Sequence, residues 1–213
     1  MRLLATDART FLIRAAERLR PEPPGELEPH SNPKGDHELQ FDGTFLPPLR
    51  PKPAAVLVPI VTHDEEATVL LTQRAPGLRD HSGQIAFPGG KVDANETPLE
   101  AALREAEEEI GLDRRHVRPL GYLDPYLSSS GYHIMPVVSL VSPALSLTPN
   151  RHEVAEAFEV PLAFLMNPDN HELHAREWRG RCRQYYAIPF DTHYIWGVTA
   201  GILRNLYERL CQS

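Results

Sequence analysis

Three glutamates crowd one edge of a helix that the sequence predicts over residues 98–110. Glu105 and Glu109 lie four positions apart and stack on one flank, and Glu108 lies within reach of both. Like charges at this spacing repel, so the local cost indicates a functional site. Carboxylate oxygens suit Mg²⁺ or Mn²⁺, ions that a few carboxylates commonly hold beside a phosphate substrate. The alternative is a solvated acidic helix face, and the glutamates alone leave both interpretations open.

The helix that carries these glutamates has clear start and stop signals. Thr97 is placed as the N-cap, Pro98 occupies the first helical position, and Glu100 completes a Thr-x-x-Glu capping box. Gly111 supplies the stop. One apolar stripe must face a sheet, and its members are Leu99, Ala102, Leu103, Ala106 and Ile110.

The segment from Gly90 to Leu112 fits one fixed pattern. The pattern is glycine, five residues, glutamate, seven residues, Arg-Glu, an apolar position, any residue, Glu-Glu, any residue, glycine and an apolar residue. It resembles the Nudix box of hydrolases that cleave a nucleoside diphosphate linked to another moiety. The matching residues are Gly90, Glu96, Arg104, Glu105, Glu108, Glu109, Gly111 and Leu112. Ala106 is small where a larger aliphatic residue is common, which affects packing more than chemistry.

The resemblance implies metal-assisted hydrolysis of a pyrophosphate, with Mg²⁺ or Mn²⁺ as the cofactor. Glu105, Glu108 and Glu109 would be the metal ligands, with Glu105 and Glu109 first among them. Arg104 and Glu96 would orient the ligating carboxylates. Bound metal ions polarise phosphoryl oxygens and lower the pKa of an attacking water.

Residues outside the helix complete the expected site. Gly89 and Gly90 let the backbone turn sharply and approach a ligand closely. The group that takes the proton of the water is either a glutamate of the box or one outside it. Glu153 is the outside candidate, and the alternative for Glu153 is an ordinary carboxylate at a strand edge.

The sequence just before the box resembles the extra motif of the coenzyme A pyrophosphatase branch of the Nudix family. It reads LLTQRAPGLRDHSGQIAFPGG over residues 70–90, with Ala75 in place of a frequent serine. The matching positions are Leu70, Leu71, Thr72, Arg74, Leu78, His81, Gly83, Gln84, Phe87, Pro88, Gly89 and Gly90. The resemblance continues through the segments 128–138, 150–165 and 195–203.

This second resemblance implies cleavage of coenzyme A, its thioesters or its oxidised forms to 3′,5′-ADP and 4′-phosphopantetheine. Coenzyme A also carries a 3′-phosphate, and Arg74, Arg79 and His81 supply cationic or donor groups beside the carboxylates. Alternatively, Arg74 only ends a strand and pairs with an acid, and His81 and Gln84 hold the backbone of their own loop.

Two other functions remain open at this point. One is a Nudix hydrolase that acts on another nucleoside diphosphate derivative, such as ADP-ribose or NADH. The other is a non-catalytic Nudix module that senses a nucleotide, which the complete set of box carboxylates disfavours.

The elements around the box predict the fold class. Helices are expected over 7–19, 98–110 and 196–210; strands are expected over 54–61, 68–74, 84–88, 119–123, 133–141 and 153–160, with a hairpin across 176–189. The strands do not alternate regularly with helices. We therefore expect an α/β (α+β) fold, a Nudix-like α/β/α sandwich with a mixed β-sheet.

Proline usage divides the chain in two. Of 213 residues, 21 are proline, and nine of these fall between residues 21 and 53. We expect 1–53 to form an N-terminal helix and an extended proline-rich lead-in, and 54–213 to form the Nudix hydrolase domain. The lead-in packs either on its own domain or on a second subunit, which leaves a homodimer open.

Charge and hydropathy exclude several partners. The formal net charge is -7, from 22 Lys+Arg against 29 Asp+Glu. The sequence therefore has no basic stripe that could bind the phosphate backbone of a nucleic acid, and a nucleic-acid partner is not expected. The apolar stretches are too short to span a membrane, and no signal peptide is evident. Cys182 and Cys211 form neither a disulfide framework nor a zinc site. We expect a cytoplasmic protein with a small-molecule substrate.

Overall fold

The computed structural model describes residues 8–24, 34–39, 50–64, 66–78, 81–144, 146–178 and 181–212. Within these ranges, nine strands form one mixed sheet with the core order β1-β7-β8-β2-β3-β4, while β5 pairs with β2, β6 with β8 and β9 with β3. Its strands are β1 (Lys34–Gly35), β2 (Lys52–Thr62), β3 (Ala67–Arg74), β4 (Ile85–Ala86), β5 (Gly89–Lys91), β6 (Val117–Tyr122), β7 (Tyr126–Leu127), β8 (Tyr132–Val141) and β9 (Val154–Pro161). The β2–β8 and β1–β7 pairs are parallel and the others antiparallel.

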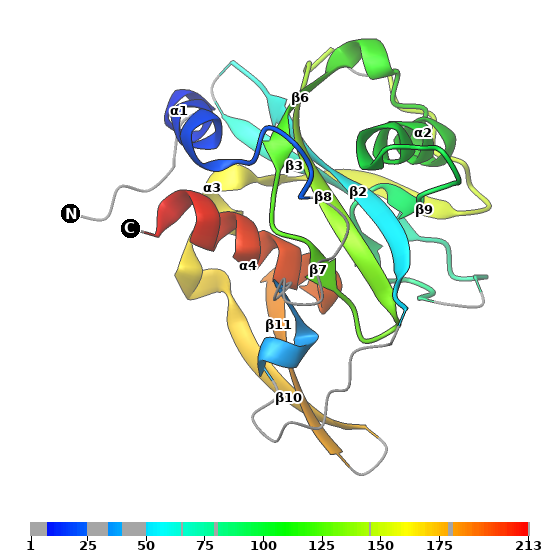
Figure 1. Ribbon diagram of the computed structural model, residues 1–213, viewed down its shortest axis with the longest axis vertical. Coiled ribbons are helices and arrows are strands. Elements are labelled where there is room, and N and C mark those ends of the chain that lie inside the picture. Colours follow the sequence, from blue (N-terminus) through cyan, green and yellow to red (C-terminus); the bar gives the residue numbers. More distant parts are fainter. Residues whose placement is uncertain are drawn as a thin grey trace.

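Helices cover both faces of this sheet, as Figure 1 shows. The helices are α1 (Ala8–Arg18), α2 (Pro98–Ile110), α3 (Leu162–Leu165) and α4 (Val198–Cys211), and short 3-10 turns span Asp36–Leu39, Arg114–His116 and Pro168–Asn170. Helix α2 packs on one face, and α1 and α4 lie on the other. This arrangement confirms the predicted α/β/α sandwich with a mixed sheet.

Each face of the sheet has its own apolar core. On the α2 side, Ala102, Ala106 and Ile110 are fully buried, and Leu99 and Leu103 pack beside them, which confirms the predicted stripe. On the other side, buried residues of α1 and α4 pack with the sheet; they include Phe11, Ala15, Leu203 and Leu206. Helix α2 therefore packs on the sheet through its apolar face. The flank that carries Glu105 and Glu109 is not part of this apolar core.

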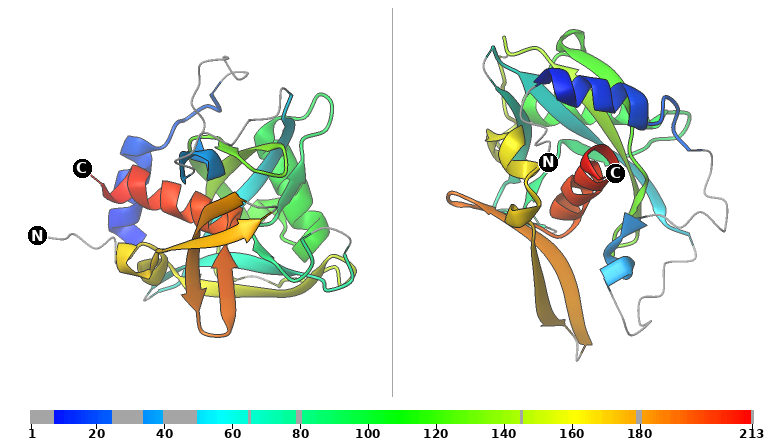
Figure 2. Two further views of the ribbon diagram at one scale, coloured as in Figure 1. Left: turned by 90° about the horizontal axis from the view of Figure 1, so that it is seen from below. Right: turned by 90° about the vertical axis from the view of Figure 1, so that its left-hand side faces the viewer.

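A second, three-stranded antiparallel sheet contains β10 (Glu172–Trp178), β11 (Arg181–Phe190) and β12 (His193–Trp196). Figures 1 and 2 show the β10–β11 ribbon extending away from the larger sheet. The predicted hairpin across 176–189 is therefore present, but β10 begins four residues earlier than predicted.

The first helix packs on its own chain. The prediction of a helix over 7–19 agrees with α1, and Arg14 donates from Nη1 to the carbonyl oxygen of Leu210 at 3.1 Å. After the helix, Arg20 and Tyr122 exchange two backbone hydrogen bonds of 3.1 and 2.8 Å. The described part of the lead-in therefore contributes to the same core as the body.

The extended path predicted for 20–53 is only partly correct. Residues 34–35 form β1, which pairs with β7, and residues 36–39 form a 3-10 turn. Residues 25–33 and 40–49 lie outside the described ranges. Strand β2 begins at Lys52, two residues before the predicted domain boundary, and the boundary itself stays a prediction. None of the described helices is long and apolar enough to cross a bilayer.

Candidate active site

Helix α2 begins and ends where its local sequence predicts. The backbone N–H of Thr97 donates to Oε2 of Glu100 at 2.8 Å, and the N–H of Glu100 donates to Oγ1 of Thr97 at 3.2 Å. Gly111 then adopts a left-handed conformation with φ of 68°, which closes the helix. The reciprocal cap fixes the first turn, so the carboxylates further along α2 project from a rigid element.

Arg104 joins three parts of this region. Its Nε and Nη2 donate to the two carboxylate oxygens of Glu96 at 2.9 and 3.0 Å, which is a bidentate pair. Its Nη1 donates to Oε1 of Glu105 at 2.9 Å, and Nη2 also reaches the carbonyl oxygen of Lys91 at 3.0 Å. The hydrogen bonds from Arg104 lower the pKa of Glu96 below its usual value, although partial burial opposes this. Arg104 therefore orients Glu105.

Glu105 lies against the backbone of β5. Its side chain is 18% exposed. A methyl group added to Gly90 would overlap the carboxylate of Glu105. Gly90 thus makes room for this carboxylate, which is held between Arg104 and the strand.

Glu109 is a buried carboxyl group. The residue is 4% exposed, its Oε2 accepts from the N–H of Gly89 at 3.1 Å, and its Oε1 lies 3.9 Å from Nη1 of Arg74. Burial raises the pKa of Glu109 to about 7, the charges of Glu105 and Glu153 add to the rise, and Gly89 and Arg74 oppose it. An added positive charge nearby stabilises the ionised form of such a carboxyl group.

Glu153 reaches this region from a turn before β9. Its carbonyl oxygen accepts from the N–H of Ala75 at 2.8 Å, and its Oε1 accepts from Nδ2 of Asn150 at 3.3 Å. Its effect on the pKa of Glu109 places the two carboxylates within electrostatic range.

Asn150 is a residue that the sequence reasoning missed. Its N–H donates to the carbonyl oxygen of Glu109 at 2.9 Å, which ties the end of α2 to the turn that carries Glu153. Its Oδ1 accepts from the N–H of His152 at 3.2 Å, an Asx turn. The available signal was an asparagine in the segment just before the predicted strand 153–160, where side chains of this type form Asx turns.

Three of the predicted residues lie apart from this cluster or outside the described ranges, and a fourth, Glu108, lies at its exposed edge. The Glu108 side chain is 60% exposed and faces Nη1 of Arg104 at 3.5 Å. Nδ1 of His81 and Oε1 of Gln84 are 2.7 Å apart in an exposed loop, so these two side chains contact each other. Arg79 falls outside the described residues. The structure brings together Arg74, Gly89, Gly90, Arg104, Glu105, Glu109 and Glu153.

The donors in this cluster suit a hard divalent cation. Across the described ranges, no three metal-ligating side chains form a ready-made binding group. The carboxylates of Glu105 and Glu109 are nevertheless close enough for the charge of one to raise the pKa of the other. Two or three carboxylates that repel one another fit the chemistry of Mg²⁺ or Mn²⁺.

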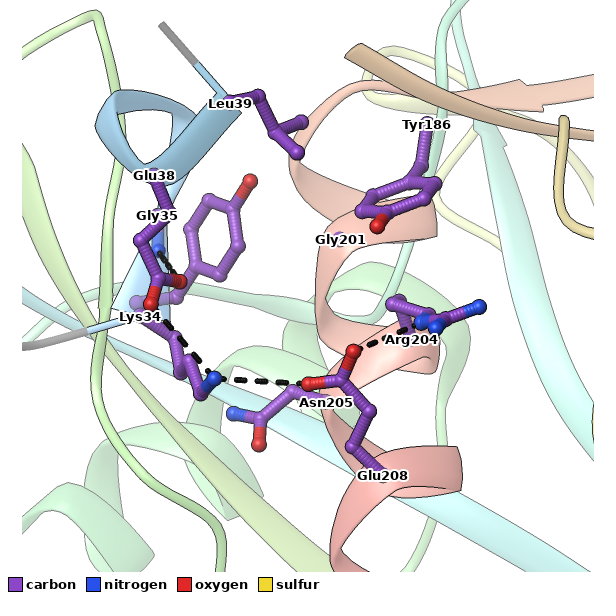
Figure 3. Close-up of a pocket in the computed structure, with 10 residues that line it drawn as sticks. Lys34, Gly35, Glu38, Leu39, Tyr186, Gly201, Arg204, Asn205 and Glu208 are labelled. Carbon is purple, nitrogen blue, oxygen red and sulfur yellow. Dashed lines mark hydrogen bonds and ion pairs between the residues drawn. The ribbon is translucent and has the colours of Figure 1, made fainter. Parts of the chain in front are cut away.

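A separate cavity of about 210 Å³ lies on the α4 side of the sheet (Figure 3). Residues 34–39 and α4 form its walls. Nζ of Lys34 lies 3.4 Å from Oε2 of Glu208, and Nε of Arg204 donates to Oε1 of Glu208 at 2.8 Å. Oε1 of Glu38 lies 3.6 Å from Nζ of Lys34, so two cations and two carboxylates balance, and these ion pairs join residues 34–39 to α4.

Comparison with known proteins places the chain in a family. The NUDIX domain matches residues 51–181. The protein named uncharacterized Nudix hydrolase NudL from Photorhabdus laumondii is 42% identical over 158 residues, which cover 74% of this chain and 84% of that protein. Its namesake from Yersinia pestis strain Pestoides F is also 42% identical, with 74% and 79% covered. The crystal structure of the Nudix hydrolase RenU from M. smegmatis is 30% identical, with a TM-score of 0.46 over 52% of this chain and 71% of that one. The chain belongs to the Nudix family.

Proposed function

We propose that the protein is a Mg²⁺- or Mn²⁺-dependent pyrophosphohydrolase that cleaves coenzyme A, its thioesters or its oxidised forms to 3′,5′-ADP and 4′-phosphopantetheine. The observation that carries the proposal is the position of Arg74. This arginine belongs to the segment 70–90, which resembles the coenzyme A motif, and its Nη1 lies 3.9 Å from Oε1 of Glu109 in the box. The substrate motif and the acidic helix therefore contribute to one site.

The roles of the carboxylates follow from their positions. Glu105 and Glu109 would hold the metal ion, and Glu108 would be a third ligand. A bound ion polarises the phosphoryl oxygens and lowers the pKa of the attacking water. Arg104 keeps Glu105 in place through its 2.9 Å hydrogen bond, and its bidentate pair with Glu96 prevents it from swinging away.

Arg74 binds the anionic substrate. Its Nε is buried and has no hydrogen-bond partner within the described part of the chain, so the guanidinium retains donor capacity. A phosphate oxygen supplies the missing acceptor and is held in the bidentate geometry that arginine favours.

Glu153 accepts the proton in the hydrolysis. The oxygen of water forms a bond to one phosphorus of the pyrophosphate, and the bridging P–O bond breaks so that its oxygen leaves with the other phosphate. The carboxylate of Glu153 takes the proton that the water loses. Nδ2 of Asn150 donates to its Oε1 at 3.3 Å and orients it toward the cluster.

The test is an assay of the purified protein with coenzyme A and Mg²⁺, in which chromatography detects 3′,5′-ADP and 4′-phosphopantetheine. We expect both products in equal amounts, and none from Glu109→Gln. Fast turnover of ADP-ribose or NADH without cleavage of coenzyme A would overturn the proposal that coenzyme A is the substrate. Binding of coenzyme A without turnover of any of these compounds would indicate a nucleotide-sensing module instead.

A variant of Arg74 separates substrate recognition from chemistry. Arg74→Lys keeps the charge and loses the bidentate geometry, so we expect a raised KM for coenzyme A with a smaller change in kcat. Coenzyme A that lacks its 3′-phosphate is the matched substrate, because it shows whether Arg74 contacts the pyrophosphate or the 3′-phosphate.

A further inference from the structure

Strand β10 has an open edge. It pairs with β11 through seven aligned residues from Glu172 to Trp178, and within the described ranges no strand lies along its other side. Figures 1 and 2 show this ribbon projecting from the body of the molecule. An exposed edge presents unpaired backbone N–H and C=O groups that can pair with another strand.

Glu172 of this ribbon contacts Nε2 of His174 at 2.6 Å, but one cross-strand pair of charges is unfavourable within one chain. Arg176 of β10 lies directly opposite Arg183 of β11, and both are exposed. Like charges directly opposite each other destabilise a strand pair. Neither arginine has an ion pair with any described residue. Arg176 is therefore left without a paired carboxylate within the described part of the chain.

We propose that a second copy of the chain supplies this carboxylate by pairing antiparallel along β10. With a two-fold axis at His174, Glu172 of each subunit lies opposite Arg176 of the partner subunit, and this occurs twice. The two three-stranded sheets then form one continuous six-stranded sheet. Because the interface is the same patch on both subunits, the assembly closes as a dimer.

The same register covers exposed apolar surface. Leu173 is 51% exposed, one of the few large apolar side chains so exposed among the described residues. In this register it lies opposite Ala175 of the partner subunit, which leaves room for the leucine. A shift of the axis to Ala175 would instead place Leu173 opposite a glutamate and His174 opposite an arginine. The axis at His174 is therefore the favoured one.

Charge reversal tests the interface and its register together. Arg176→Glu places two glutamates opposite each other at both contacts, and Glu172→Arg places two arginines there. We expect each single variant to raise the dissociation constant of the dimer by about tenfold or more in sedimentation velocity. The variants are compared over roughly 1 to 100 μM protein at low salt.

A mixture of the two single variants is the decisive sample. In the mixed dimer, both contacts again join an arginine to a glutamate, so the heterodimer forms with a lower dissociation constant than the homodimer of either variant. The double variant Glu172→Arg/Arg176→Glu restores a homodimer for the same reason. Arg176→Glu also replaces the Arg176–Arg183 contact by an attractive one, so loss of its dimer cannot be ascribed to a less stable hairpin.

The control is Arg118→Glu, which makes the same change in net charge at an exposed position of β6. We expect it to dimerise as the wild type does. A wild type that stays monomeric at the highest concentration would overturn the proposal. So would a dimer that neither reversal weakens, or a mixture that fails to form the heterodimer.

Discussion

The carboxylate of Glu105 rests directly on the backbone of Gly90, with no space between them for a methyl group. The backbone of Gly90 is not in the left-handed region, so this glycine is required for space rather than for conformation. Arg104 holds the same carboxylate from the other side at 2.9 Å. Strand β5 and helix α2 therefore fix Glu105 jointly.

Gly90→Ala should displace Glu105 while the fold is kept. An added methyl group moves the carboxylate away from the cluster, and misplacement by about 1 Å can lower turnover roughly hundredfold. The measurement is kcat with coenzyme A, beside the circular dichroism of the variant. Gly77→Ala is the matched control, because nothing lies within 4 Å of the added methyl group. Equal kcat for the two variants would contradict this reading of Gly90.

Glu109→Gln should stabilise the protein in a pH-dependent manner when a chelator is present. The pKa of Glu109 is about 7 in the folded protein against an ordinary 4.5. The folded state therefore binds this proton more tightly than the unfolded state, and Glu109 lowers the free energy of unfolding as the pH rises from 4.5 to 7. Glutamine carries no such charge.

The expected gain from Glu109→Gln is on the order of 2 kcal/mol above neutrality and shrinks toward zero near pH 4. Urea unfolding at pH 8 and at pH 5 measures it. Glu107→Gln, on the exposed side of the same helix, serves as the control and should show no comparable pH dependence. A pH-independent gain at Glu109 would show that its charge is not the cause.

Arg104→Lys should weaken metal binding. Lysine keeps one positive charge but cannot hold both oxygens of Glu96 while it also donates to Glu105. Loss of a group that orients a metal ligand typically costs about 10 to 100-fold in metal affinity. Activity measured across a Mg²⁺ titration gives the midpoint, which we expect to rise by that factor. Arg114→Lys alters an exposed ion pair with Glu107 and should leave the midpoint unchanged.

Glu153→Gln should lower kcat and change KM little. A general base contributes about a hundredfold or more to the rate, and glutamine cannot accept the proton. The pH–rate profile is the second readout, since its acidic limb should change shape when the base is removed. Glu156→Gln, an exposed position in β9, is the control. A value of kcat close to that of the wild type would assign the base to a glutamate of the box.

Local signals explain which elements the sequence predicts well. The bounds of α2, Pro98–Ile110, agree with the prediction because Thr97, Pro98, Glu100 and Gly111 act within a few residues. The strand pair β1–β7 could not be predicted, since its two-residue strands are distant in sequence. The start of β10 was missed although Glu172 to Arg176 alternate polar and apolar side chains, which is the pattern of a half-buried strand.

In the candidate site, too, local sequence spacing predicts some features and long-range contacts determine the others. Spacing along one helix placed Glu105 and Glu109 on a common flank, and the structure has both in the cluster. The Glu108 side chain is 60% exposed and lies 3.5 Å from Nη1 of Arg104, and spacing along the helix does not specify that exposure. The bond from Asn150 to the carbonyl oxygen of Glu109 joins two segments that only the folded chain brings together.

The contact between the first and last helices bears on how the chain folds during synthesis. Arg14 and Leu210 are 196 positions apart, and Phe11 and Ala15 are fully buried in the core that α4 completes. Helix α1 is synthesised well before α4, on which it packs. Until then the apolar face of α1 stays exposed, as is usual for contacts of high sequence separation. Completion of this core therefore waits for synthesis of α4, and a ribosome that stalls within the last turns of α4 would hold a chain whose first helix has its contacts with β6 but lacks those with the end of α4.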